Sequence, residues 1–163
     1  MKQTYLPILS ILLSFISTPL LANILDDLVI DSSYKIEVYA SGLDSPRQLA
    51  ESADGWIFIG SRSGGTIFAV KDTDGNGESD TKSIVAEDLS MATGVSLFNG
   101  DLYFSEVSKI WKINNIEEWL KNPRDADKFP EKNLVIDNLP DDTWHGWKWL
   151  QHDQQGRLYF NVG

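Results

Sequence analysis

The sequence has no cysteine, and this absence excludes several ways of holding a protein or a ligand together. Without thiols the chain has no disulfide bonds, no thiolate-bound metal and no lipid attached through sulfur. The fold must therefore be stabilised by packing. Hydrophobic residues make up 42% of the chain, with six Trp and seven Phe, which is enough apolar surface for the core of one domain.

Positive charge is also scarce. The chain carries 14 Lys and Arg against 24 Asp and Glu, a formal net charge of −10 at pH 7. A surface this acidic repels phosphate backbones, so we expect no nucleic acid partner.

Long hydrophobic runs are missing, apart from one at residues 5–16 that follows Lys2. At about a dozen residues this run is shorter than the roughly 20 that a membrane-spanning helix needs. A basic start, a short apolar run and a small residue at Ala22 are the parts of a secretory signal peptide. We therefore predict a signal peptide over residues 1–22, a periplasmic or secreted protein, and no membrane span in the mature chain.

Three segments of the remaining chain repeat one pattern, at residues 45–70, 92–113 and 144–163. Each segment has a short apolar strand, a glycine-centred turn and a strand with alternating aromatic residues. The turn glycines are Gly55, Gly100 and Gly156, spaced 45 and 56 residues apart. Strand-built repeats of this length are typical of the blades of a β-propeller.

The repeats define the predicted organisation of the chain. We expect a linker at residues 23–33 and then about three propeller blades at residues 34–163, with a short helix near residues 116–120, capped by Asn114 or Asn115, inserted after the second hairpin. Three blades do not close a ring, so we predict an all-β, partial β-propeller that is the N-terminal fragment of a longer protein. A complete three-module domain is the alternative.

Only two histidines occur, and one of them stands at a position that suggests chemistry. His145 lies where we expect the inner strand of the third unit to begin, as Arg47 and Thr93 do in the first two units. Equivalent positions of propeller blades converge at the axis, where a histidine can remove a proton from a hydroxyl and an arginine can bind carboxylates. Alternatively, His145 only fills a gap among neighbouring tryptophans. His152, beside Asp153, is interpreted as a solvated turn residue.

An acidic segment at residues 72–80, with the sequence DTDGNGESD, suggests a cation site. Oxygen-bearing side chains occupy the first, third, fifth and ninth positions, as in calcium-binding loops, but Ser83 stands where such loops have a bidentate glutamate. Calcium binding and an unliganded acidic turn between two outer strands are both open. The predicted ligands are Asp72, Asp74, Asn76 and Asp80.

The segment from His145 to the end of the chain resembles the blade with the catalytic histidine in soluble quinoprotein glucose dehydrogenases and sorbosone dehydrogenases. Residues 42–50, the acidic loop and residues 92–104 resemble the first blades of the sorbosone branch. The resemblance covers residues 34–163. It implies a six-bladed propeller that binds pyrroloquinoline quinone (PQQ) across its axis, with His145 as general base on a sugar or aldehyde substrate and an external electron acceptor. Arg47 and Thr93 would lie near the cofactor.

The resemblance is incomplete in two respects. Met91, Ala92 or Thr93 stands where glucose dehydrogenases place a glutamine against the cofactor, so the sugar remains open. The family's further cofactor-binding residues would lie beyond Gly163, and we expect this chain alone to be inactive. A non-catalytic propeller that binds glycans or proteins is the alternative function. A metal-centred lactonase is disfavoured, because the axial candidates are not carboxylates.

Overall fold

In a computed structural model, the chain is described at residues 25, 27–122 and 128–162. The predicted signal peptide lies outside these residues. The chain divides into two compact units, Met1–Glu37 and Val38–Gly163. In the described part of the first unit, Asp31 accepts hydrogen bonds from the backbone and hydroxyl of Ser33. Among the described helices, none is long and apolar enough to cross a membrane.

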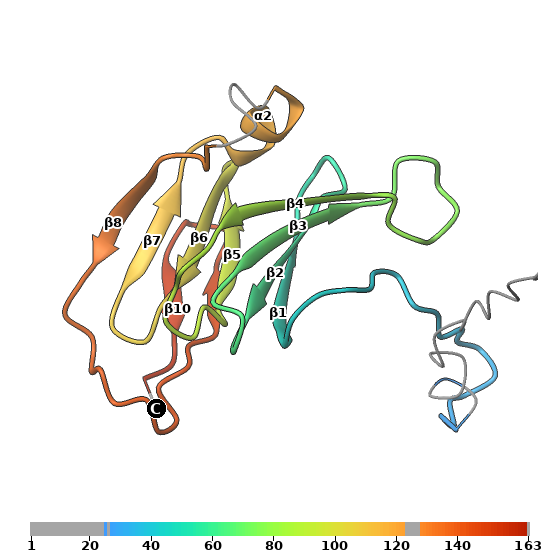
Figure 1. The fold of residues 1–163 in the computed structure, drawn as a ribbon, viewed down its shortest axis with the longest axis horizontal. Helices are drawn as coiled ribbons and strands as arrows, with labels where there is room; N and C mark the ends of the chain where they lie inside the picture. Colours follow the sequence, from blue (N-terminus) through green and yellow to red (C-terminus); the bar gives the residue numbers. More distant parts are fainter. Residues whose placement is uncertain (1–24, 26, 123–127, 163) are drawn as a thin grey trace, which may run out of the picture. The chain divides into compact units, whose positions relative to one another are not determined.

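The second unit contains three antiparallel sheets whose strands follow one another in chain order (Figure 1). The first two sheets have four strands each, and the third has two. The strands are β1 (Pro46–Glu51), β2 (Ile57–Ser61), β3 (Ile67–Lys71) and β4 (Thr81–Ala86); β5 (Val95–Phe98), β6 (Asp101–Ser105), β7 (Ile110–Ile113) and β8 (Lys132–Ile136); and β9 (Leu150–His152) and β10 (Leu158–Phe160).

The three predicted hairpins are present, and the three predicted glycines shape their turns. Gly55, Gly100 and Gly156 have φ angles of 80°, 81° and 79°, a left-handed conformation that costs glycine little because it has no Cβ. The first and third hairpins also share their register, since Glu51 pairs with Ile57 and His152 pairs with Leu158 across turns of equal length. The repeat seen in the sequence is therefore a repeat in structure.

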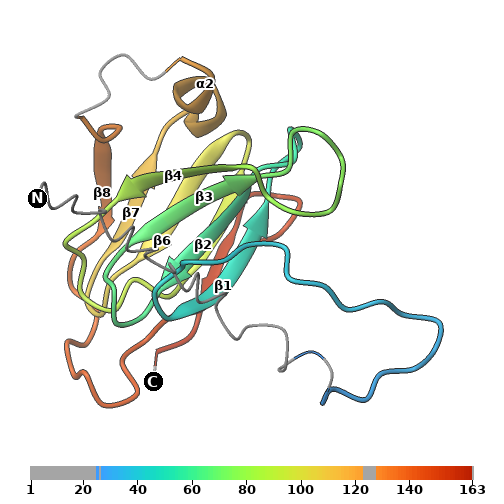
Figure 2. The same ribbon diagram turned by 45° about the vertical axis from the view of Figure 1, so that its right-hand side comes forward.

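The sheets meet along their first strands. β5 packs beside both β1 and β9, so the first strand of the second sheet lies between the first strands of the other two sheets (Figures 1 and 2). The main core fills the space between the first two sheets, where alternate residues point inward. Its fully buried side chains include Phe58, Ile67 and Ala69 from the first sheet, and Val95, Leu102 and Phe104 from the second.

The opposite face of the first sheet is covered by the chain that leads into it. Ile59, Phe68 and Val70 form a second buried cluster there. Tyr39, Ala40 and Leu43 pack against this cluster. We call residues 39–43 the cap.

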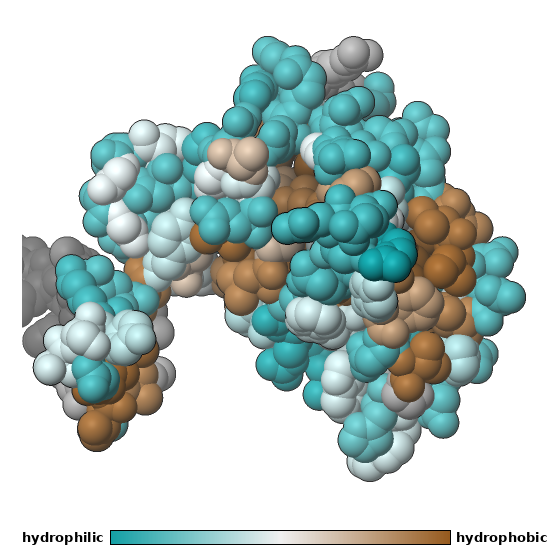
Figure 3. Space-filling view, turned by 180° about the vertical axis from the view of Figure 1, so that it is seen from behind, coloured by the Kyte–Doolittle hydropathy of each residue, from teal (hydrophilic) through white to brown (hydrophobic). Residues whose placement is uncertain are grey.

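The third sheet is covered on one face. Leu150 is fully buried, whereas Trp149 and Tyr159, which point the other way, are 52% and 51% exposed. Hydrophobic residues also reach the surface on the face of the molecule in Figure 3. Among the described residues, no strand pairs with the free edge of β10.

A short helix, α2 (Ile116–Lys121), lies in the connection between β7 and β8 and contributes to the longer second repeat interval. The helix was predicted, but the predicted capping by an asparagine side chain was wrong. Asn115 adopts a left-handed backbone conformation with φ 47°, and its side chain makes no capping hydrogen bond within the described residues. Instead, the Asn115 backbone amide donates to Asp101. The helix is anchored by Ile116, which is buried in the main core.

Candidate functional site

A cavity of about 450 Å³ lies where the first strands of the three sheets approach one another. This volume is within the usual range for small-molecule sites. The residues around it come from all three sheets, so the cavity exists only because the sheets are assembled. They are Arg47, Gln48 and Leu49 of β1, Thr93 before β5, and Trp147, Lys148 and Trp149 before β9.

The structure brings together two of the three residues that the sequence placed at one mouth. Arg47 and Thr93 both line the cavity, whereas its described lining does not include His145. The predicted equivalence was wrong by three residues: Arg47 stands four residues before Glu51, and it is Lys148 that stands four residues before His152. His145 lies upstream of β9, in the loop that leads to the cavity.

Gln48 holds the three first strands together, a role that the sequence did not reveal. Its side-chain Nε2 donates to the Leu150 carbonyl at 2.6 Å. Its Oε1 accepts from the backbone amides of Leu150 at 2.9 Å and Val95 at 3.2 Å. One amide side chain therefore satisfies backbone groups of both β5 and β9, which fixes the wall of the cavity.

Thr93 and Lys148 form a second connection between the sheets. The Thr93 hydroxyl donates to the Lys148 carbonyl at 2.8 Å and accepts from its amide at 3.2 Å. Thr93 is only 3% exposed, so it shapes the wall, and its hydroxyl hydrogen is already used. Lys148 is 2% exposed and its Nζ donates to the Gly146 carbonyl; burial lowers the pKa of its amine.

His145 is exposed and lies between two indole rings. Its ring centroid is 5.2 Å from Trp144, in an edge-on arrangement, and 5.2 Å from Trp147. Because Trp147 also lines the cavity, His145 contacts a residue of the cavity wall. The backbone of His145 has a φ of 63°, a conformation that non-glycine residues rarely adopt and that is enriched at functional sites.

A second arginine, Arg62, contacts the same tryptophan as His145. The Arg62 guanidinium lies 4.6 Å from the centre of the Trp147 ring, a cation–π contact between the first and third sheets. The sequence interpretation missed Arg62 because it follows the second strand of its hairpin, outside the repeat position that was compared. Arg62 therefore contacts a residue of the cavity wall, but it is not part of the described lining, whereas Arg47 is.

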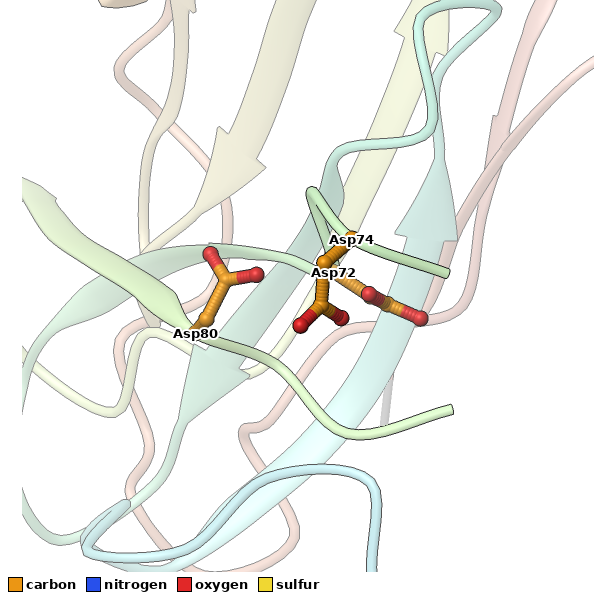
Figure 4. A group of neighbouring side chains, drawn as sticks. All are labelled: Asp72, Asp74 and Asp80. Atoms are coloured by element: carbon orange, nitrogen blue, oxygen red, sulfur yellow. The ribbon is translucent and has the colours of Figure 1, made fainter. Parts of the chain in front are cut away.

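The predicted calcium ligands lie in the turn between β3 and β4. Ligand oxygens of Asp72, Asp74 and Asp80 lie within 4.8 Å of one another (Figure 4). The loop folds around these carboxylates: Asp72 accepts from the amides of Gly75 at 2.7 Å and Gly77 at 2.8 Å. The hydrogen bond from Gly77 is the main cause that lowers the pKa of Asp72.

Asn76 and Asp80 complete the described loop. The Asn76 side-chain oxygen accepts from the Glu78 amide, so it points at the loop backbone. Asp80 accepts from the backbone and hydroxyl of Thr73, and these bonds lower the pKa of Asp80. These hydrogen bonds to the carboxylates offset the repulsion between the neighbouring acidic side chains. The predicted calcium site stays a prediction, because these hydrogen bonds stabilise the turn with or without an ion.

His152 was interpreted as a solvated turn residue, and this was wrong. It is 8% exposed, its Nδ1 lies 2.9 Å from the Ser96 hydroxyl, and its ring stacks on Phe98 at 5.3 Å and contacts Tyr103 at 4.4 Å. Burial lowers the pKa of His152. His152 therefore joins the second and third sheets.

Comparison with known proteins places this architecture. No family model matches the chain. A curated relative, an uncharacterized protein of Borreliella burgdorferi, is 25% identical over 146 residues, which cover 86% of this chain and 37% of the relative. The chain therefore spans little more than a third of the length of that relative.

Solved structures give the fold. The PQQ domain of pyranose dehydrogenase from Coprinopsis cinerea matches with a TM-score of 0.59 and 16% identity, over 77% of this chain and 29% of that one. The fold is that of a β-propeller. The calcium structure of a Trichoderma reesei enzyme of carbohydrate-active family AA12 has a TM-score of 0.61 and 15% identity, over 78% and 31% of the two chains.

A third propeller, the PQQ-bound aldose sugar dehydrogenase of Streptomyces coelicolor, has a TM-score of 0.54 and 20% identity, over 78% of this chain and 40% of its own. The prediction of an all-β, partial β-propeller is confirmed. In propeller terms the first two sheets are four-stranded blades, β1, β5 and β9 are the inner strands, and the cavity lies at their ends.

Proposed function

We propose that this propeller belongs to a PQQ-dependent dehydrogenase that oxidises a sugar or an aldehyde. The supporting observation is the cavity at the inner strands, which has Arg47 on its wall and His145 in contact with the wall residue Trp147. Two of the structural neighbours described above have names that include both PQQ and a sugar class, pyranose or aldose. Because the chain spans 29–40% of the lengths of these neighbours, turnover is proposed for the complete gene product, and the 163-residue chain alone is expected to be inactive.

The side chains around the cavity fit the chemistry of the proposed cofactor. PQQ is a flat aromatic quinone with carboxylate groups, and arginine binds carboxylates through paired hydrogen bonds. Arg47 would hold these carboxylates, and the aromatic residues Trp147 and Trp149, which also line the cavity, would contact the flat ring system. When bound, the quinone supplies the acceptor for a hydride.

In this proposal, His145 is the general base. It would take the proton from the substrate hydroxyl as the hydride leaves the carbon of the same C–OH group, so that one C–H and one O–H bond become a carbonyl. A histidine suits this task because its ordinary pKa lies near neutrality. The flanking rings of Trp144 and Trp147 restrict the imidazole, and the left-handed backbone at His145 fixes the direction of its side chain.

Four further parts of the proposal concern the location of the protein, its electron acceptor, its branch of the family and its metal. We propose that the protein is exported to the periplasm or secreted, as the pattern of residues 1–22 predicts, and that it passes electrons to an external acceptor. Within the dehydrogenases, the sorbosone branch is proposed on the strength of residues 42–50 and 92–104. Calcium is proposed to bind the loop of Asp72, Asp74, Asn76 and Asp80, in a structural role away from the cavity.

The test uses the full-length gene product, titrated with PQQ while its tryptophan fluorescence and its aldose-dependent dye reduction are followed. We expect saturable quenching, weaker in Arg47→Ala, and dye reduction that falls by at least 10²-fold in His145→Ala. Gln151→Ala, an exposed change on β9, is the matched control. A folded protein that binds no PQQ would refute the proposal and favour a propeller that only recognises glycans or proteins.

A further inference from the structure

Trp144 is the most exposed of the six tryptophans, with 80% of its surface open to solvent. Trp56 is buried, and Trp111 and Trp119 pack against the main core. An indole ring in water is a large exposed apolar surface, and such surfaces commonly mark binding sites. The position of Trp144, directly before His145, makes a functional explanation worth testing.

The loop that carries Trp144 is shaped by contacts among its own residues. The Trp144 amide donates to the Asp142 carboxylate at 2.9 Å. At Gly146, a Cβ atom would lie 2.0 Å from the Asp142 carbonyl oxygen, so only glycine fits there. Together with the left-handed His145, these contacts present the exposed ring on a fixed turn.

The surroundings of the ring indicate what it binds. Asp141, Asp142 and Thr143, which precede it, are all exposed and polar, and the imidazole of His145, which follows it, contacts the indole, so polar groups flank the exposed ring. A protein-binding surface would be a larger continuous apolar patch. A neutral pyranose has the matching chemistry, because its C–H face packs on an aromatic ring while its hydroxyls bond to polar groups around the edge.

We propose that Trp144 is a stacking platform for the pyranose ring of an aldose. This inference rests on the proposed function, since it names the residue that would hold the sugar beside His145. The imidazole centroid lies 5.2 Å from the indole centroid with the two rings nearly perpendicular, so a sugar ring on the exposed indole would bind next to the residue proposed as the base. Trp144 is therefore a positioning residue, whereas His145 acts on the proton.

The test measures sugar binding by the full-length protein without any cofactor. Saturation-transfer NMR and tryptophan fluorescence are recorded with three neutral aldopyranoses, namely glucose, galactose and mannose, and with sorbitol as an open-chain control. We expect at least one pyranose to bind at least tenfold more tightly than sorbitol. Trp144→Ala should weaken that binding at least fivefold, and Trp144→Phe, which keeps an aromatic face, should retain most of it.

Two controls separate this inference from the dehydrogenase proposal. Tyr34→Ala removes another aromatic ring, 75% exposed, outside the propeller unit and should leave sugar binding unchanged. The absence of PQQ from the binding assay is the second control, because the measured sugar affinity then does not depend on cofactor binding or dye reduction. Binding that survives Trp144→Ala, or a folded wild-type protein that binds no pyranose, would overturn the inference, whichever way the PQQ titration turns out. Circular dichroism verifies the fold of each variant.

Discussion

The first and third sheets begin with hairpins of the same register, yet their outer faces differ. On the first sheet, the cap at residues 39–43 covers Ile59, Phe68 and Val70. On the third sheet, the outward-facing Trp149 and Tyr159 remain half-exposed within the described structure. One local sequence pattern therefore forms the same hairpin twice, and only the neighbouring segment decides whether its second face is buried.

The largest effect is expected where the third sheet is tied to the first two. Gln48→Ala would leave the amides of Val95 and Leu150 and the Leu150 carbonyl without partners, at a cost of about 2–4 kcal/mol in unfolding free energy. Urea denaturation measures this loss. The control, Gln151→Ala on the exposed face of β9, should cost less than about 0.5 kcal/mol. Equal losses of stability in both variants would show that the Gln48 hydrogen bonds do not hold the third sheet to the first two.

The difference between the two faces is tested directly by two tyrosines. Tyr39→Ala removes packing against the capped cluster and the hydrogen bond from the Asp72 amide to its hydroxyl, and should destabilise the protein by about 2–3 kcal/mol. Tyr159→Ala, on the open face, should change stability by about 0.5 kcal/mol or less. If Tyr159→Ala were the more damaging change, the third sheet would be covered in solution.

If the acidic loop binds calcium, calcium should stabilise the first sheet together with the cap at residues 39–43. Tyr39 is bonded to this loop, because its hydroxyl accepts from Asp72 and its carbonyl from Ser79. A loop with a Kd of about 1 mM would gain about 1.4 kcal/mol from 10 mM calcium. Thermal unfolding should therefore shift upward with calcium in the wild type and not in Asp74→Asn. The exposed Asp141→Asn serves as control, and an identical shift in Asp74→Asn would contradict the site.

The smallest expected effect is a dependence on pH at the third sheet. Burial lowers the pKa of His152 below its ordinary value of 6.5, so the unfolded chain binds a proton more readily than the folded one. The stabilisation from neutral His152 is complete above about pH 6.5 and declines as the pH falls below that value. Urea midpoints between about pH 5 and 8 measure it. His152→Phe should flatten this part of the profile; an unchanged slope would assign it to other groups.

The fold was largely predictable because its elements are local. Period-two patterning and the glycines at 55, 100 and 156 predict hairpins, and the left-handed φ angles of these glycines supply the reason. The site was less predictable. Alignment by sequence put His145 at the position of Arg47, but strand pairing gives that position to Lys148, since register is set by hydrogen bonds across the sheet.

Two polar residues show why sequence reasoning missed parts of the site. His152 follows a strand pattern beside Asp153 and was taken for a turn residue, yet the second sheet buries it against Ser96. Gln48 is an ordinary polar residue within a strand, and nothing in its neighbours predicts that it bonds to two other strands. Both roles depend on a partner that is distant in the chain.

By itself, the sequence determined the three hairpins, the glycine turns and the acidic loop, because each of these depends on residues within about a dozen positions of one another. Only the tertiary structure decided which side chains share the cavity. Gln48 and Leu150 are 102 residues apart, and their hydrogen bond exists because separate sheets pack along their first strands. Local backbone preferences do not predict a contact between residues so far apart in the chain. The contact forms because the sheets bury their faces against one another.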